Sequence, residues 1–139
     1  MKLEQQVATF EQSKKLKELG VEIDSYFWWC DYGKKGSTDY IIESKLPEIC
    51  RQNIGTYPAP TAEEIAELLP GQIKIEGNLY EYCQEKVCKR YDMSYVCIED
   101  NLEHLNIIKH ADTLTQALAS MLIWLIENKH INPKELNGK

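Results

Sequence analysis

The pattern of apolar and polar residues predicts three helices, and each is preceded by a threonine that can cap it. A glutamine or glutamate stands three residues after each threonine, which is the spacing of a capping box. Gly20 can supply a left-handed C-terminal cap to the first helix, and Pro70-Gly71 stops the second. The predicted helices begin after Thr9, Thr61 and Thr113 and end near Leu19, Leu69 and Lys129.

The last of these helices, from Thr113 to about Lys129, is the most apolar segment of the chain. Its apolar residues extend almost all the way round the helix, which a surface helix does not require. We therefore expect it either to lie at the centre of the domain or to contribute to an oligomer interface. Pro133 is expected to end it, and residues 129–139 are predicted to form a loose tail. The apolar positions are Leu114, Ala117, Leu118, Met121, Leu122, Ile123, Trp124, Leu125 and Ile126.

Between the helices, alternation of apolar and polar residues predicts strands that pair as hairpins. The clearest hairpin turns at Gly77-Asn78, where glycine in the first position suits a two-residue turn. This register places Ile75 opposite Tyr80 and Ile73 opposite Tyr82. All four side chains then lie on one face, so we expect that face to belong to the core.

The alternation breaks after Cys83, where we expect a bulge or a bend. The next predicted strand, 94–99, is apolar on both faces at its centre, which favours a central strand covered on both sides. A turn at Asp92-Met93 would place Cys88 opposite Cys97.

The fold that these elements predict is α+β, with a single domain spanning residues 1–139. We expect an antiparallel sheet built from hairpins and packed against three helices, of which the C-terminal helix is the most apolar. A chain of 139 residues with 43% apolar residues can build one hydrophobic core without a metal or a disulfide.

The chain carries a formal charge of −6, from 22 acidic and 16 basic side chains. Such a surface repels phosphate backbones, so nucleic acid is not expected as a partner. The N-terminus has no apolar segment of signal-peptide length, and the longest apolar run, residues 121–126, is too short to cross a membrane. We therefore expect a cytoplasmic protein without a membrane partner. Five cysteines, an odd number, agree with reduced thiols.

The cysteines allow two kinds of chemistry. A structural zinc site could draw on Cys83, Cys88, Cys97 and His104, although the first two are spaced just wider than in zinc modules. Free cysteine also packs readily as a small apolar group. A thiol nucleophile such as Cys30 would need a histidine base within reach, and no local motif marks one. We predict no metal, no cofactor and no catalytic residue, and hence a protein that is not an enzyme, with the zinc question left open.

Aromatic residues are concentrated on one predicted hairpin, with a strand at 26–32, a loop at 33–37 and a returning strand from Tyr40. One face of this hairpin belongs to the core, and the other could be an exposed aromatic surface, which would mark a recognition site. The alternative is that helices cover both faces. The residues predicted to form this binding surface are Tyr26, Trp28, Trp29, Tyr32 and Tyr40.

Three blocks of the sequence form a distinctive combination. They are Thr9–Val21 followed by Ser25–Trp28, then Tyr57–Thr61 with Leu69-Pro70, and finally Met121–Leu125 with the closing Glu127–Lys129. This combination resembles a group of small phage and prophage proteins that have no assigned activity. The resemblance covers most of the chain but not residues 72–106. It implies a phage or prophage origin, and it implies no mechanism.

The residues and the resemblance together predict a phage-derived accessory protein that acts by binding. The expected partner is a host or phage protein, engaged through the aromatic hairpin. One alternative is an oligomeric binder of a small ligand, such as a nucleotide signal, or an inhibitor of host defence. The wide apolar arc of the last helix would permit a homo-oligomer of that kind. A second alternative is a thiol-dependent enzyme.

Overall fold

The computed structural model describes residues 2–31, 40–44, 56–98 and 107–137. Within these ranges the chain has the α+β architecture that the sequence predicts, with antiparallel sheets built from hairpins and packed against helices. The predicted single sheet is in fact two separate sheets.

The helices of the described residues are α1 (Leu3–Gln6), α2 (Phe10–Glu18), α4 (Ala62–Ala66), α5 (Leu114–Glu127) and α6 (Pro133–Leu136). Thr9 caps α2 and Thr61 caps α4, and both form the full capping box. Thr113 caps α5 by accepting a hydrogen bond from the Gln116 backbone N–H at 3.1 Å. Gly20 follows α2 with a φ of 88°, so the predicted left-handed cap is confirmed.

The strands are β1 (Phe27–Asp31), β2 (Tyr40–Ser44), β3 (Thr56–Pro58), β4 (Gln72–Ile75), β5 (Asn78–Val87), β6 (Arg90–Cys97) and β7 (Ile107–Ala111). They form a three-stranded sheet in the order β2-β1-β3 and a four-stranded sheet in the order β4-β5-β6-β7. The predicted pairing of β1 with the strand that starts at Tyr40 is confirmed, and β6 is a central strand.

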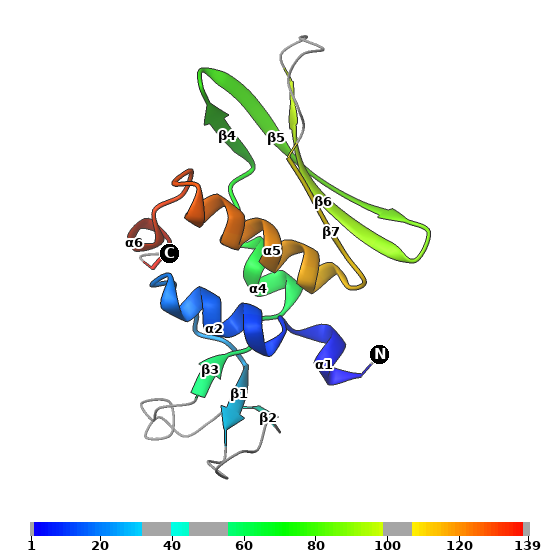
Figure 1. Cartoon of the computed structure of the whole chain (residues 1–139), viewed down its shortest axis with the longest axis vertical. Helices are drawn as coiled ribbons and strands as arrows, with labels where there is room; N and C mark the ends of the chain where they lie inside the picture. Colours follow the sequence, from blue (N-terminus) through cyan, green and yellow to red (C-terminus); the bar gives the residue numbers. More distant parts are fainter. Residues whose placement is uncertain (1, 32–39, 45–55, 99–106, 138–139) are drawn as a thin grey trace.

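The helices lie between the two sheets (Figure 1). In this arrangement α5 packs against β6 and β7 on one side and against α2 and α4 on the other. The wide apolar arc of α5 is therefore explained by its central place in the domain. In the described part of the chain, no helix combines the length and the hydropathy needed to traverse a bilayer. The buried residues of α5 are Thr115, Ala117, Leu118, Ala119, Met121, Leu122, Leu125 and Ile126.

A smaller apolar cluster holds the three-stranded sheet against α2. Val7, Trp29 and Ala59 are its buried members. Phe10 of α2 and Tyr57 of β3 pack edge to face, with ring centres 5.4 Å apart. Aromatic contacts of this geometry stabilise the pair beyond the burial of their area. Aromatic side chains thus contribute to the contact between the three-stranded sheet and α2.

The β4–β5 hairpin is present, but its register differs from the predicted one. Ile73 lies opposite Tyr80 rather than Tyr82, and the turn residues are Glu76 and Gly77. Both have positive φ, 52° and 84°, which matches the turn whose twist suits a hairpin. A shift of two residues preserves the alternation, so the same side chains still face the core.

The β5 strand continues past Cys83 to Val87, and the expected bulge or bend is absent. The next turn lies at Cys88-Lys89, so Cys97 is opposite Tyr80 and the predicted Cys88–Cys97 pairing is wrong. The alternation fades here because residues 83–90 are all exposed. Where neither face is buried, nothing selects apolar residues on one of them.

Only one face of the four-stranded sheet is well buried among the described residues. Met93 and Tyr95 point toward the helices and are completely buried. On the opposite face Val96 is half-buried, and Ile98, which follows the strand, is 46% exposed. The expectation that this strand is covered on both sides is therefore wrong. Its apolar outer residues reflect its central position between two neighbours rather than a second layer.

Residues 133–137 are folded and do not form the predicted loose tail. Pro133 is the first residue of α6, a position where the missing N–H of proline has no cost. Leu136 is buried in the main core, with 4% exposure. Asn132 caps this short helix by accepting a hydrogen bond from the Lys134 backbone N–H at 3.0 Å. Pro133, which was expected to end a helix, therefore begins another one.

Candidate functional site

The aromatic residues of β1 include two that lie in the interior. Trp28 and Trp29 have exposed fractions of 7% and 9%. Their indole N–H groups donate to the backbone carbonyls of Ser25 and Ala8, both at 2.9 Å. Because both rings are enclosed and both N–H groups are bonded within the chain, these tryptophans hold the sheet in place. The prediction that they belong to an exposed aromatic surface is wrong.

Tyr26, just before β1, is exposed at 52%. Its ring packs edge to face against Phe27, with ring centres 5.0 Å apart. Tyr40 is the first residue of β2, but its side chain lies outside the described residues, as does the whole of Tyr32. A recognition role for these three tyrosines stays a prediction.

The thiols considered as metal ligands are distributed over the four-stranded sheet. Cys83 and Cys88 are exposed and Cys97 is half-buried. The register places Cys83 and Cys97 on opposite faces. Within the residues that the structure describes, no three His, Cys, Asp or Glu side chains are grouped as metal ligands would be. His104 and the side chain of Cys30 lie outside those residues.

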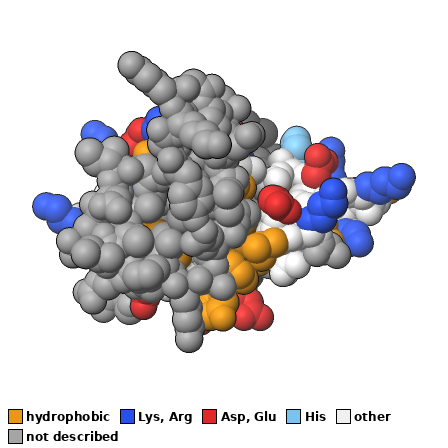
Figure 2. Space-filling model, turned by 90° about the horizontal axis from the view of Figure 1, so that it is seen from below, with side chains coloured by type: hydrophobic (Ala, Val, Ile, Leu, Met, Phe, Trp, Pro, Cys, Tyr) orange, Lys and Arg blue, Asp and Glu red, His pale blue; other side chains and the backbone are white. Residues whose placement is uncertain are grey.

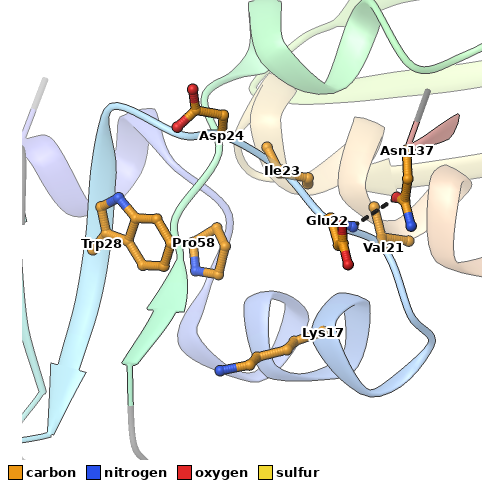
Figure 3. Close-up of a pocket in the computed structure, with 8 residues that line it drawn as sticks. All are labelled: Lys17, Val21, Glu22, Ile23, Asp24, Trp28, Pro58 and Asn137. Carbon is orange, nitrogen blue, oxygen red and sulfur yellow. Dashed lines mark hydrogen bonds between the residues drawn. The ribbon is translucent and has the colours of Figure 1, made fainter. Parts of the chain in front are cut away.

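A pocket of about 460 Å³ opens between the end of α2, the segment after it, and the start of the three-stranded sheet (Figure 3). Its volume falls in the range of roughly 300–1,000 Å³ that is usual for small-molecule sites. The lining residues among those that the structure describes are Lys17, Val21, Glu22, Ile23, Asp24, Trp28, Pro58 and Asn137. We call this the α2–β1 pocket.

Apolar side chains face each other across the α2–β1 pocket. Trp28 of β1 and Pro58 of β3 lie side by side, and Val21 and Ile23 lie across from them (Figure 3). The Trp28 ring is held in place by its hydrogen bond to the Ser25 carbonyl. The apolar part of the pocket is therefore formed before any ligand enters.

Charged groups border the same pocket. The Lys17 ammonium lies 5.1 Å from the centre of the Tyr57 ring, which places it against an aromatic face. Glu22 and Asp24 are both exposed and supply carboxylates from the segment that follows α2. Figure 3 shows Lys17 and Asp24 at opposite ends of the wall that Trp28 and Pro58 form. Side chains of both charges thus border the pocket.

The β5–β6 hairpin extends beyond the helices as an arm, which we define as residues 83–92 (Figure 1). Val87, near its tip, is 38% exposed. Tyr91, which lies opposite Lys86, lines a second pocket of about 390 Å³ together with residues of α1, α4 and α5. Lys86 lies with its ammonium 5.4 Å from the centre of the Tyr91 ring. The arm therefore carries accessible apolar and cationic groups next to a hollow.

The charge of the arm differs from that of the chain as a whole. Residues 83–92 contain three basic and two acidic side chains, whereas the chain has 16 basic and 22 acidic ones. Figure 2 shows Lys and Arg side chains gathered at the end of the molecule that the arm occupies in Figure 1. Arg90 is paired with Asp92 at 3.0 Å. Lys86 and Lys89 are the remaining cations of a locally positive surface.

Sequence reasoning missed both features, for different reasons. The arm had a signal, because Lys86, Lys89 and Arg90 lie close together where the apolar alternation stops. The end of the alternation was interpreted as a bulge or a bend, so an exposed basic hairpin was not predicted. The α2–β1 pocket had no local signal as a whole, because its residues come from α2, the segment after it, two strands and Asn137.

Comparisons with known proteins were made at the level of family, sequence and structure. No protein-family model matches the chain, no curated protein matches it significantly, and neither does any solved structure. Function is therefore inferred from the groups that the fold brings to its surface.

Proposed function

We propose that this protein acts by binding another protein, and that the arm carries the contact. The observation that supports this most directly is the exposure of every residue from 83 to 90 on a hairpin that extends beyond the helices. Among the described strands β7 reaches only as far as Tyr91, so the end of the hairpin, residues 87–90, is two-stranded, and a two-stranded ribbon is marginally stable without a covered face. Contact with a partner would cover it.

The chemistry of the arm favours a partner with an acidic surface. Lys86 and Lys89 are exposed, and Val87, on the opposite face of the hairpin from Lys86, adds an accessible apolar group. Opposite charge raises the rate of encounter and selects among partners, while apolar contact adds affinity. The hollow beside Tyr91 could receive a side chain of the same partner.

A protein partner is favoured over a nucleic acid by the charges around the arm. The chain as a whole is acidic, and Glu85 and Asp92 lie on the arm itself. Asp92 also engages Arg90, which reduces the number of cations available to phosphates. Nucleic-acid binding draws most of its affinity from many phosphate contacts. The resemblance to phage proteins adds a phage origin to this proposal.

Charge reversal on the arm tests the proposal. We expect Lys86→Glu with Lys89→Glu to abolish capture of one or more acidic proteins by the tagged chain from a lysate of the cells that encode it. With the purified partner, the association rate should fall about tenfold or more at low salt. Quantitative mass spectrometry identifies the partner, and surface plasmon resonance gives the rates.

The control is the variant Lys14→Glu with Lys134→Glu, which makes the same change in net charge on α2 and α6. It should keep the partner. If both double variants capture the same proteins as the native chain, the arm is not the contact. Loss of a bound nucleic acid instead of a protein would also overturn the proposal.

A further inference from the structure

We propose that the pocket beside the arm binds one apolar side chain of the partner protein, from a segment in which acidic residues flank that side chain. This is the pocket of about 390 Å³ that Tyr91 lines together with residues of α1, α4 and α5, and we call it the Tyr91 pocket. The inference rests on the proposed function of the arm, and it deepens that proposal by naming the chemistry of the segment that the partner presents.

The apolar part of the Tyr91 pocket comes from Ala62, Tyr91 and Leu114. All three are only partly buried, and all three pack against the main core of the domain. The core therefore supports the apolar wall of the pocket from behind. A side chain of the size of leucine or phenylalanine that entered here would bury apolar surface on both molecules, which is the main source of affinity where one residue anchors an interface.

Contacts between distant segments hold the helices around the pocket. The Thr115 hydroxyl donates to the Gln6 carbonyl at 3.1 Å, which links α5 to α1. Val7, just after α1, pairs with Thr61, the residue that caps α4. The helical side of the pocket is thus formed before a partner arrives, and a preformed site loses less conformational entropy when it binds.

The charge beside the pocket favours acidic flanking residues. Lys86 lies opposite Tyr91 in the hairpin, and its ammonium is 5.4 Å from the centre of the Tyr91 ring. Leu114 and Thr115 are the first two residues of α5, so the positive end of that helix dipole also borders the pocket. Glu63, from the first turn of α4, lines the pocket too and carries the opposite charge. We therefore assign the acidic residues of the segment to the side that Lys86 borders.

The polar groups of the pocket favour a side chain of a larger partner over a free small molecule. Sites for small molecules usually combine an apolar hollow with polar groups that converge on the ligand and fix its orientation. Thr115 is a buried polar residue of the lining, and its hydroxyl already donates to the Gln6 carbonyl. The Lys86 ammonium lies beside Tyr91, where it can contact groups that flank an inserted side chain.

The chemistry of the segment is tested with three peptides. Ac-Asp-Asp-Phe-Asp-Asp-NH₂ carries the apolar anchor and the acidic flanks, Ac-Asp-Asp-Ala-Asp-Asp-NH₂ lacks the anchor, and Ac-Asn-Asn-Phe-Asn-Asn-NH₂ lacks the charges. Each is titrated into the full chain and followed by two-dimensional NMR through the backbone N–H signals of Tyr91, Leu114 and Thr115. We expect saturable shifts with the first peptide. Binding should be about tenfold weaker without the phenyl group and about threefold weaker without the charges.

Two variants separate the pocket from the charge. Ala62→Phe adds a ring at a residue that lines the pocket, so binding of the acidic phenylalanine peptide should fall to that of its alanine counterpart. Lys86→Met should weaken both acidic peptides about threefold and leave the asparagine peptide unchanged. Ala62 is partly exposed and Lys86 is exposed, so the fold should be retained, and thermal unfolding checks that it is. Lys14→Met removes the same charge from α2, outside the pocket lining, and should leave all three peptides unchanged.

The inference is overturned if the acidic phenylalanine peptide gives no saturable shift up to its solubility limit, or if the alanine or the asparagine peptide binds as tightly. It is also overturned if Ala62→Phe folds and binds that peptide as the native chain does. If Ala62→Phe unfolds, the three peptides with the native chain still decide.

Failure of this inference can be distinguished from failure of the proposal for the arm. If Lys86→Glu with Lys89→Glu loses the captured partner while Ala62→Phe keeps it, the arm is the contact and the pocket is not its anchor. If Ala62→Phe alone loses the partner, the proposal for the arm fails instead.

Discussion

The side-chain oxygen of Asn137 accepts a hydrogen bond from the backbone N–H of Glu22 at 2.8 Å, although 115 positions separate the two residues. The same side chain donates to the Gly20 carbonyl at 3.0 Å. The end of the described chain therefore closes onto the segment that follows α2. This contact places Asn137, the residue after α6, at the α2–β1 pocket.

Replacing Asn137 with alanine removes both of these hydrogen bonds. We expect the free energy of unfolding to fall by about 1 kcal/mol, because the bonds lie at an exposed site where water replaces part of each one. Urea denaturation followed by circular dichroism measures the change. Lys134→Ala, in the same helix, is the control and should cost less. An equal loss in the two variants would show that Asn137 does not secure α6.

Gln12 joins α2 to α5. Its Nε2 donates to the Gln116 carbonyl at 2.9 Å and to the Ser120 hydroxyl oxygen at 3.0 Å, while its Oε1 accepts from the Thr9 backbone N–H. Gln12→Ala should therefore lower the free energy of unfolding by about 2 kcal/mol, since it removes a cap and an interhelical link together.

Gln5→Ala is the matched control for Gln12, because within the described residues the Gln5 side chain bonds only to the Lys2 backbone N–H, in the capping box of the four-residue α1. It should cost well under half as much in the same urea experiment. If the two glutamines prove equivalent, the link from α2 to α5 contributes no stability of its own.

The β4–β5 turn contains a residue that is poorly suited to its backbone. Glu76 has a φ of 52°, a left-handed conformation that asparagine adopts more readily than glutamate. Glu76→Asn should raise the free energy of unfolding by up to about 1 kcal/mol. Gly77→Ala, at a φ of 84°, should lower it by a similar amount. Thermal unfolding of both variants checks the pair, and stabilisation by the alanine would contradict the turn geometry.

Tyr95 should make the protein sensitive to alkaline pH. Burial is the main cause that raises the pKa of Tyr95 above its usual value of about 10, and the neighbouring Tyr82 adds to it. The unfolded chain therefore loses this proton at lower pH than the native chain. The stabilisation from the neutral phenol is complete below about pH 10 and is lost as pH rises further, by up to about 1.4 kcal/mol per pH unit.

Tyr95→Phe separates this pH effect from the structural role of the hydroxyl. At neutral pH the variant should lose about 1 kcal/mol, because the Tyr95 hydroxyl donates to the Pro70 carbonyl at 2.6 Å. Above pH 10 its stability should fall less steeply than that of the native protein. Urea denaturation across pH 8 to 11.5 measures both. Parallel pH profiles would rule out Tyr95 as the source of the sensitivity.

The helix starts were predictable because capping depends on residues within one turn. Thr9 and Thr61, each with its partner three residues on, formed the expected capping boxes. The core face of the β4–β5 hairpin was also predictable, since alternation survives a shift of two residues. Its register was not, because the choice between Glu76-Gly77 and Gly77-Asn78 depends on how the flanking strands twist.

The candidate sites were much less predictable than the elements that carry them. Trp28 and Trp29 were correctly placed on a strand, but whether an aromatic ring faces solvent depends on what packs against it. Here both rings are buried, and their indole N–H groups donate to the carbonyls of Ser25 and Ala8. The α2–β1 pocket depends on the hydrogen bond between Asn137 and Glu22. No sequence pattern near either residue predicts that contact.

The sequence by itself determined the α+β class, the capped helices and an apolar α5, because these depend on periodicity and on contacts within a few residues. Only the tertiary structure decided that α5 is central, that the chain folds into two sheets, and that residues 83–90 are exposed on one hairpin. Burial and charge at a surface are properties of what lies next to a residue in space. The exposure of the groups proposed to bind is therefore decided by what packs beside them rather than by any one motif.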